Sequence, residues 1–171
     1  MTLPNILSII RMILAVPIAY TLWNRMDILA AVFAVFASVL DIADGIIARK
    51  YKLITELGKI LDPLADKLLI GIIIIILLIQ GRFPLWFAAA FLVRDTLIVL
   101  GGIYAKKKTG YVLPSNWPGK IAAILTGITV LGYILSIAFI ENYVIWIAFA
   151  FMLLSFSMYL YRFIRHMESS E

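Results

Sequence analysis

The sequence contains no cysteine, a single histidine and few charged residues. Without cysteine, disulfides and thiolate chemistry are excluded, and the redox compartment cannot be read from the chain. Only 15% of the 171 residues are charged, whereas 64% are hydrophobic. About a quarter of the residues in a typical soluble domain are charged. This chain therefore lacks the polar surface that a water-facing globule needs.

The chain contains long stretches of apolar residues with few charges among them. Several runs approach or exceed the roughly 20 residues with which a helix crosses about 30 Å of hydrocarbon. The chain has room for about six such helices and little else. We therefore predict an all-α integral membrane protein with six transmembrane helices, forming a single membrane domain over residues 1–171. The predicted helices cover approximately residues 5–23, 28–49, 58–79, 84–105, 119–140 and 143–163.

The cations are distributed unevenly between the two ends of these helices. Arg25 and Arg82 lie in turns at one end. Ten cations lie at the other: Arg49, Lys50, Lys52, Lys59, Lys106, Lys107, Lys108, Lys120, Arg162 and Arg165. The positive-inside rule then places both termini and the loops after the second and fourth helices in the cytoplasm. We expect a multi-pass protein of the cell membrane, either an inner or a plasma membrane. Its expected partner is the lipid bilayer, and we expect no nucleic acid partner.

The ionisable residues within the apolar segments gather at one point of the sequence. They follow a regular spacing together with small residues: Asp41, Asp44, Gly45, Ala48 and Arg49 on the second helix, then Gly58, Asp62 and Asp66 on the third. Steps of three and four residues keep each set on one helical face. If these two helices are antiparallel neighbours, the four carboxylates converge near the cytoplasmic surface.

Four carboxylates cannot share a low-dielectric pocket as bare anions, because their mutual repulsion is too large. They must protonate, pair with Arg or Lys, or bind metal. Oxygen ligands without His or Cys favour a hard cation such as Mg²⁺, Mn²⁺ or Ca²⁺. Four carboxylates on two helices suit a two-metal site, which clamps a pyrophosphate and stabilises charge in phosphoryl transfer. The alternative is a set of structural ion pairs or small-residue helix packing.

The run from Asp41 to Asp66 resembles the signature of the CDP-alcohol phosphotransferase family, with every fixed residue and every gap matching. The resemblance implies a six-helix membrane enzyme, usually a homodimer, that uses two divalent metal ions, Mg²⁺ or Mn²⁺. It implies transfer of a phosphatidyl group from CDP-diacylglycerol to an alcohol, with release of CMP. The implied metal ligands are Asp41, Asp44, Asp62 and Asp66, and Asp66 is the implied general base. The implied CDP-binding residues are Asp41, Asp44, Gly45, Ala48, Arg49 and Gly58.

The start of the chain carries a second, weaker resemblance. Asn5, Ser8 and Arg11 are similar to the Pro-Asn-x-x-Thr-x-x-Arg opening of family members that make phosphatidylglycerophosphate, with Ser8 in place of Thr. Asn5 is either a helix N-cap or a CDP contact. Arg11 either snorkels to the interface or contacts the nucleotide or the metal-ligand aspartates.

The acceptor alcohol is less clearly indicated than the donor. Our leading acceptor is glycerol 3-phosphate, supported by the opening of the chain and by the cations Arg94, Lys106 and Lys120, which we predict to bind it. Each also has a plainer explanation. Arg94 and Asp95 can pair with other helices to lower the cost of two charges in a membrane, and the lysines can serve as topology signals.

Other acceptors and another class of function stay open. Inositol phosphate, serine and phosphatidylglycerol are alternative acceptors, and an archaeal ether lipid is an alternative donor. Polar residues that usually follow the Gly119-Lys120 pair in glycerophosphate-using relatives are missing here. Aspartates in membrane helices would also suit a divalent-cation transporter. That role predicts polar residues across the bilayer, whereas Leu68–Ile79 offers none.

Overall fold

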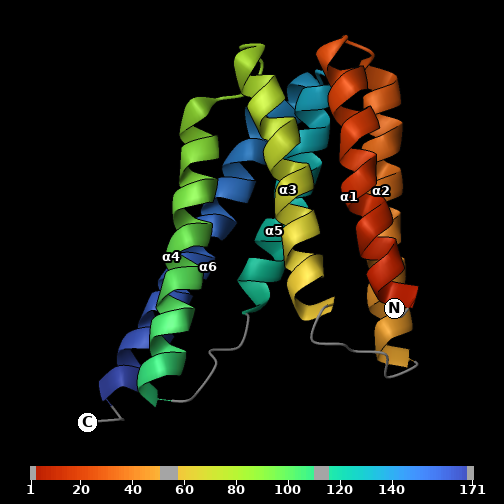
Figure 1. Cartoon of the computed structure of the whole chain (residues 1–171). Coiled ribbons are helices and arrows are strands. Elements are labelled where there is room, and N and C mark those ends of the chain that lie inside the picture. Colours follow the sequence, from red (N-terminus) through yellow and green to blue (C-terminus); the bar gives the residue numbers. More distant parts are fainter. Residues whose placement is uncertain (1–2, 51–57, 110–115, 169–171) are drawn as a thin grey trace. The chain divides into compact units, whose positions relative to one another are not determined.

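The computed structural model describes residues 3–50, 58–109 and 116–168, and the side chains of residues 6–47, 65–108 and 116–166. Over these ranges the chain is helical, with no strand. In chain order the helices are α1 (Leu3–Trp23), α2 (Asp27–Lys50), α3 (Gly58–Ile79), α4 (Leu85–Thr109), α5 (Trp117–Ile134), the π-helix η1 (Ile140–Val144) and α6 (Ile145–Glu168) (Figure 1). The all-α prediction is confirmed.

Most of these helices can cross a membrane. Five stretches in the described residues are long and apolar enough: Ile6–Trp23, Asp27–Ile47, Leu85–Lys108, Trp117–Ile134 and Ile140–His166. The 22 residues of α3 add a helix about 33 Å long at 1.5 Å per residue. Large apolar side chains such as Ile13, Val16 and Tyr20 lie on the outside of α1. Lipid is the solvent that accepts such a surface, so the chain is a multi-pass membrane protein.

The chain forms two compact units. One comprises Met1–Phe83 with Val130–Ser136, and the other comprises Pro84–Thr129 with Ile137–Glu171. We describe each unit by itself. A single membrane domain over residues 1–171 stays a prediction.

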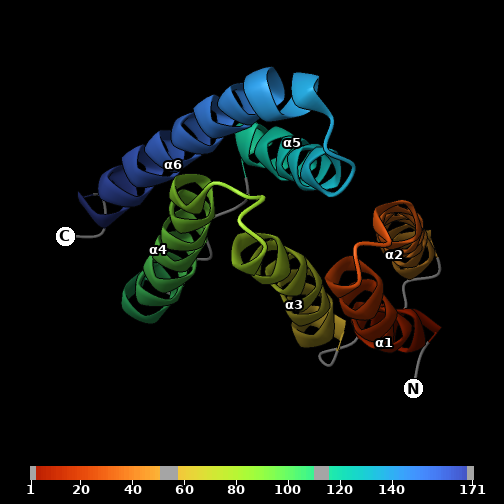
Figure 2. The same ribbon diagram turned by 90° about the horizontal axis from the view of Figure 1, so that it is seen from above.

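In the first unit, α1 is the common neighbour of α2 and α3 (Figure 2). Its buried residues recur at steps of three and four and form one continuous stripe: Ser8, Arg11, Ala15, Ile18 and Leu22. The buried residues of α2 are small, among them Ala30, Ala34 and Ala37. Small side chains let membrane helices approach each other closely. This packing brings the start of α1 to the end of α2.

Arg82, in the turn before α4, closes the opposite end of the first unit. Its Nη1 and Nη2 donate to the two carboxylate oxygens of Asp27, at 2.8 and 2.9 Å. Nη2 also donates to the carbonyl oxygen of Ile134 at 2.7 Å and, more weakly, to that of Tyr133 at 3.3 Å. One guanidinium thus joins the start of α2, the end of α3 and the end of α5.

Arg82 also explains where the sequence prediction was wrong. We predicted a helix to residue 140, whereas α5 ends at Ile134. The last carbonyls of a helix have no partner within the helix, and Arg82 binds two of them. Ser136 then takes a left-handed φ of 53° and lies within 3.2 Å of Nη2. The residue that binds these carbonyls lies about 50 positions earlier, so the local pattern could not reveal it.

In the second unit, α4 packs against α6. Gly101 and Gly102 leave space for the ring of Tyr159, whose hydroxyl donates to the carbonyl oxygen of Ile98 at 3.0 Å. Near the other end of the pair, the rings of Trp86 and Trp146 stack with centroids 5.0 Å apart. These contacts hold α4 and α6 together along their length.

We predict that Arg82→Ala destabilises the protein by about 2–3 kcal/mol, because it leaves Asp27 and two helix-end carbonyls without their donor. The figure lies at or below the lower end for a broken buried ion pair, since Asp27 is partly exposed. The midpoint of thermal unfolding in detergent, followed by circular dichroism, measures the change. Arg25→Ala is the control, since Arg25 is exposed in the turn before α2 and should change stability by less than about 0.5 kcal/mol. Equal effects of the two substitutions would contradict this account.

Candidate active site

Three of the four predicted aspartates meet at the guanidinium of Arg11. Nη1 of Arg11 donates to Oδ1 of Asp41 and, at 2.7 Å, to Oδ1 of Asp66. Nη2 donates to Oδ2 of Asp44 at 3.1 Å. Asp41 and Asp44 belong to α2, Asp66 belongs to α3, and Arg11 belongs to α1 between them. The predicted convergence of carboxylates from two helices is therefore present for these three, through a third helix.

Burial separates the members of this cluster. The side chains of Arg11 and Asp44 are only 2% and 5% exposed, whereas those of Asp41 and Asp66 are each 45% exposed. Arg11 and Asp44 thus form the buried part of the cluster. Asp41 and Asp66 keep oxygen atoms that a ligand can reach from outside.

Arg11 is placed by the buried stripe of α1. It lies one turn after Ser8, whose side chain is fully buried, and one turn before Ala15. A guanidinium on this face cannot reach water, so it must find anionic partners. Of the two alternatives that the sequence left for Arg11, contact with the aspartates is the one observed.

The structure describes only the helix positions of most other residues that we predict to bind the nucleotide or a metal ion. Gly45 follows Asp44 on α2 and is half-buried. Ala48 and Arg49 lie in the last turn of α2, and Gly58 and Asp62 in the first part of α3. Their side chains, and that of Asn5, lie outside the described residues. Their roles stay predictions.

The three described carboxylates are of the kind that hard divalent cations prefer. Asp41, Asp44 and Asp66 offer only oxygen atoms, which are the ligands preferred by Mg²⁺ and Mn²⁺, and they already surround one positive charge. In the arrangement described, no three acidic, His or Cys side chains among the described residues are grouped closely enough to hold one ion. The guanidinium of Arg11 stands between the carboxylates.

Arg94 forms a second polar cluster, in the second unit. Its Nη1 donates to Oδ1 of the adjacent Asp95 at 2.8 Å, and its Nη2 donates to Oγ of Ser155 at 2.8 Å. The Ser155 hydroxyl donates to Oδ1 of Asn116 at 2.9 Å, and the Asn116 amide donates back to the Ser155 carbonyl at 2.9 Å. The sequence suggested that these two charges pair with other helices. Arg94 instead pairs with its neighbour Asp95 and reaches α6 through the Ser155 hydroxyl. A role of Arg94 in binding the acceptor stays a prediction.

Asn116 and Ser155 were missed in the sequence. Asn116 caps α5, because its Oδ1 accepts a hydrogen bond from the backbone N–H of Gly119 at 2.8 Å. The signal for this cap was present, since Asn immediately before Trp117-Pro118 matches an N-cap followed by an early helical proline. Ser155 carried a weaker signal, as a polar residue inside an apolar run.

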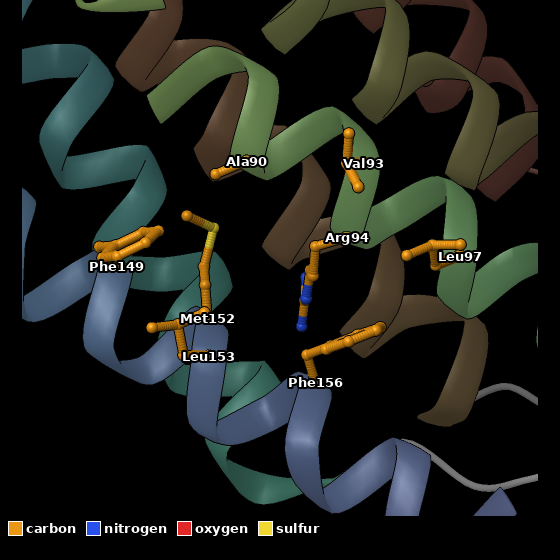
Figure 3. Close-up of a pocket in the computed structure, with 8 residues that line it drawn as sticks. All are labelled: Ala90, Val93, Arg94, Leu97, Phe149, Met152, Leu153 and Phe156. Carbon is orange, nitrogen blue, oxygen red and sulfur yellow. The ribbon is translucent and has the colours of Figure 1, made fainter. Parts of the chain in front are cut away.

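A cavity of about 240 Å³ lies beside Arg94, between α4 and α6 (Figure 3). Its lining is apolar except for Arg94 and comprises Ala90, Val93, Arg94, Leu97, Phe149, Met152, Leu153 and Phe156. The side chain of Arg94 extends from α4 toward α6. Its two terminal nitrogens are bound by Asp95 and Ser155, so the cavity offers a ligand mainly apolar contacts.

The two lysines predicted to bind the acceptor lie on the surface of the second unit. Lys106 lies in the last turn of α4, and Lys120 lies in the first turn of α5. Both are exposed. Their positions near helix ends suit either a phosphate contact or an interfacial charge, so both readings of the sequence stay open.

Comparison with known proteins identifies the family to which the chain belongs. Residues 1–154 match the model of the CDP-alcohol phosphatidyltransferase family. The match includes α1 and all four predicted aspartates. Because it covers most of the chain, the protein belongs to this family.

Several curated proteins are similar to parts of the chain. A CDP-diacylglycerol--glycerol-3-phosphate 3-phosphatidyltransferase from Rickettsia bellii is 50% identical over 80 residues, which is 44% of each chain. The protein of that name from Aquifex aeolicus is 32% identical over 133 residues, or 77% of this chain and 74% of the relative. A cardiolipin synthase (CMP-forming) / mitochondrial hydrolase fusion protein from Schizosaccharomyces pombe is 39% identical over 108 residues, 63% of this chain. The chain spans 18% of this fusion protein and 44% of the Rickettsia protein.

We predict that Gly119→Ala disrupts the polar cluster around Arg94. A methyl group at this position would lie 2.7 Å from Oδ1 of Asn116 and 2.9 Å from Oγ of Ser155, too close for either atom to stay. The substitution should lower stability by about 1–3 kcal/mol, measured as the thermal midpoint in detergent.

Gly127→Ala is the matched control, because it changes the same helix where nothing lies within 4 Å. Alanine is favoured over glycine inside a helix by about 1 kcal/mol, so this variant should be as stable as the original protein or more stable. A Gly119→Ala protein that unfolds at or above the temperature of Gly127→Ala would contradict the prediction.

Proposed function

We propose that the protein moves a phosphatidyl group from CDP-diacylglycerol to an alcohol, with release of CMP. The observation that carries the proposal is the meeting of Asp41, Asp44 and Asp66, from two helices, around one cationic centre. The names of the relatives from Rickettsia bellii and Aquifex aeolicus support glycerol 3-phosphate as the acceptor, which would give phosphatidylglycerophosphate. The enzyme would work in phospholipid biosynthesis.

In this reaction an acceptor hydroxyl attacks the β-phosphorus of the CDP-lipid. Asp66 is the proposed general base: it accepts the hydroxyl proton as the new oxygen–phosphorus bond forms. The bond between the β-phosphorus and the bridging oxygen breaks, and CMP leaves with that oxygen. The 45% exposure of the Asp66 side chain leaves it reachable by an incoming alcohol.

The family uses divalent metal ions in general, and we propose Mg²⁺ or Mn²⁺ here. Asp41, Asp44, Asp62 and Asp66 would hold two ions. When bound, these would neutralise the diphosphate and stabilise the charge that develops on CMP. Asp44, as the most buried of the three described carboxylates, would fix the position of the set.

The remaining substrate contacts are assigned from the sequence. We assign the CDP moiety to Asp41, Asp44, Gly45, Ala48, Arg49, Gly58 and Asn5. Glycine and alanine leave the backbone accessible, and Arg49 offers a planar donor for phosphate. The acceptor phosphate is assigned to Arg94, Lys106 and Lys120, of which both lysines are exposed.

We also propose that the site faces the cytoplasm from the inner or plasma membrane, and that the enzyme is a homodimer. The orientation is supported by the ten cations at the end of the helices where Arg49 and Lys59 lie. The dimer is supported only by the family resemblance.

One comparison favours a different acceptor. The Schizosaccharomyces pombe relative is named as a cardiolipin synthase, and phosphatidylglycerol would be the acceptor for that activity. The reaction on the donor side would be unchanged, because the same carboxylates would serve a larger, lipid-borne alcohol.

The decisive experiment gives the purified protein in detergent CDP-diacylglycerol, Mg²⁺ or Mn²⁺, and one alcohol at a time. The alcohols are glycerol 3-phosphate, phosphatidylglycerol, inositol phosphate and serine, and CMP release is measured. We expect release with glycerol 3-phosphate and none without metal. Release with phosphatidylglycerol alone would overturn our choice of acceptor, and no release with any alcohol would count against the transferase itself.

Asp66→Asn tests the proposed base. The amide keeps the shape of the carboxylate but cannot accept the proton, so kcat should fall at least 100-fold. Lys67→Gln, which changes the exposed neighbour on α3, should keep most of the activity. If Asp66→Asn turned over CDP-diacylglycerol at the original rate, Asp66 would not be the base.

A further inference from the structure

Asn116 and Ser155 form a buried pair within the second unit. Asn116 immediately precedes α5, Ser155 belongs to α6, and the two residues are 6% and 1% exposed. The Ser155 hydroxyl donates to Oδ1 of Asn116 at 2.9 Å, and the Asn116 amide donates to the carbonyl oxygen of Ser155 at 2.9 Å. Oδ1 of Asn116 also accepts from the backbone N–H of Gly119 at 2.8 Å. The backbones of two helices therefore fix the orientation of both side chains.

This pair determines how Arg94 is held. A hydroxyl has one hydrogen to donate, and that of Ser155 goes to Asn116. Ser155 therefore presents a lone pair to Arg94, whose Nη2 donates to it at 2.8 Å. Nη2 also lies 3.4 Å from the position that a Cβ atom would take on Gly119. The guanidinium is thus held against the first turn of α5, which also carries Lys120.

Arg94 keeps donors with which it can bind an anion. A guanidinium has five N–H groups, and the hydrogen bonds to Asp95 and Ser155 use two of them. Its Nε is buried and has no hydrogen-bond partner among the residues that the structure describes. The N-terminal end of α5, against which the guanidinium lies, carries positive potential. Donors of this kind beside a positive helix end suit the oxygen atoms of a phosphate.

We propose that Asn116 and Ser155 are positioning residues for the phosphate of the acceptor, glycerol 3-phosphate in the proposed reaction. They act through Arg94, because they hold its guanidinium at the first turn of α5. The inference rests on the proposed function, since it takes Arg94 as an acceptor-binding residue. A pair that only packed α5 against α6 would stabilise the protein and would leave the affinity for the acceptor unchanged.

Ser155→Ala tests this role, because it removes the oxygen that binds Nη2 of Arg94 without adding volume. CMP release by the purified protein in detergent is measured while the concentration of glycerol 3-phosphate or of CDP-diacylglycerol is varied. Loss of a hydrogen bond to a charged group should raise KM for glycerol 3-phosphate about tenfold, whereas kcat and KM for CDP-diacylglycerol should change less than about twofold. Ser157→Ala is the matched control, since it makes the same change at an exposed position of α6 and should alter none of these constants.

Asn116→Ser provides a second variant in case Ser155→Ala does not fold. Serine is also a favourable N-cap, so the start of α5 is preserved. Its side chain is shorter and lacks the amide that binds the Ser155 carbonyl oxygen, so the Ser155 hydroxyl loses its fixed orientation. KM for glycerol 3-phosphate should therefore rise again, with KM for CDP-diacylglycerol unchanged.

A double substitution decides whether the pair acts through Arg94. Arg94→Gln alone should raise KM for glycerol 3-phosphate more than Ser155→Ala does, because it removes the charge. In the Arg94→Gln protein, Ser155→Ala should have no further effect on this KM, since residues that act as a unit are not additive. If Ser155→Ala raised KM by the same factor with and without Arg94, the pair would not act through Arg94 and the proposal would be wrong.

The other contrary results separate this proposal from the proposed function. If Arg94→Gln raises KM for glycerol 3-phosphate but neither Ser155→Ala nor Asn116→Ser does, the pair only packs the helices, and Arg94 stays the acceptor-binding residue. If Arg94→Gln leaves that KM unchanged, the assignment of Arg94 fails, and the role of the pair fails with it. If the original protein releases no CMP with glycerol 3-phosphate, the acceptor itself is wrong, and both conclusions are overturned.

Discussion

The structure depends on one constraint: a charged side chain that the helices bury needs a polar or charged partner within the same molecule. Arg11 shows this most clearly, since its buried guanidinium contacts carboxylates from two other helices. Arg82 and Arg94 follow the same rule at other places, with Asp27 and Asp95 as their partners. Arginine suits this task, because its planar fork can bind several acceptors at once. The contacts of Arg11 and Arg82 also join different helices, whereas Arg94 and Asp95 are neighbours on α4.

The cluster around Arg11 differs from a simple ion pair, in which one cation meets one anion. Here three carboxylates share one guanidinium, and two of them stay 45% exposed. Asp41 and Asp66 therefore keep oxygen atoms that a ligand can reach, and carboxylate oxygens are ligands that hard cations prefer. Membership of the CDP-alcohol phosphatidyltransferase family gives that chemistry a substrate class.

Small residues make these polar contacts possible. The alanines of α2 let α1 approach closely enough for Arg11 to reach Asp41 and Asp44. In the second unit, Gly119 leaves the space in which Asn116 and Ser155 support Arg94. Bulkier side chains at these positions would separate the helices and leave buried charges without partners. Small residues thus make room for the polar and charged side chains that partner the arginines.

The sequence by itself determined the helices, the membrane and most of the candidate site, because these follow from local patterns. Apolar runs of sufficient length predict spanning helices, and the three- and four-residue steps among the aspartates predict a shared face. Only the tertiary structure decided which charges meet. Arg11 is separated from Asp41 by 30 positions and from Asp66 by 55, and Arg82 binds the last carbonyls of α5 from about 50 positions away. Such contacts depend on how helices pack against one another, and no local spacing records that.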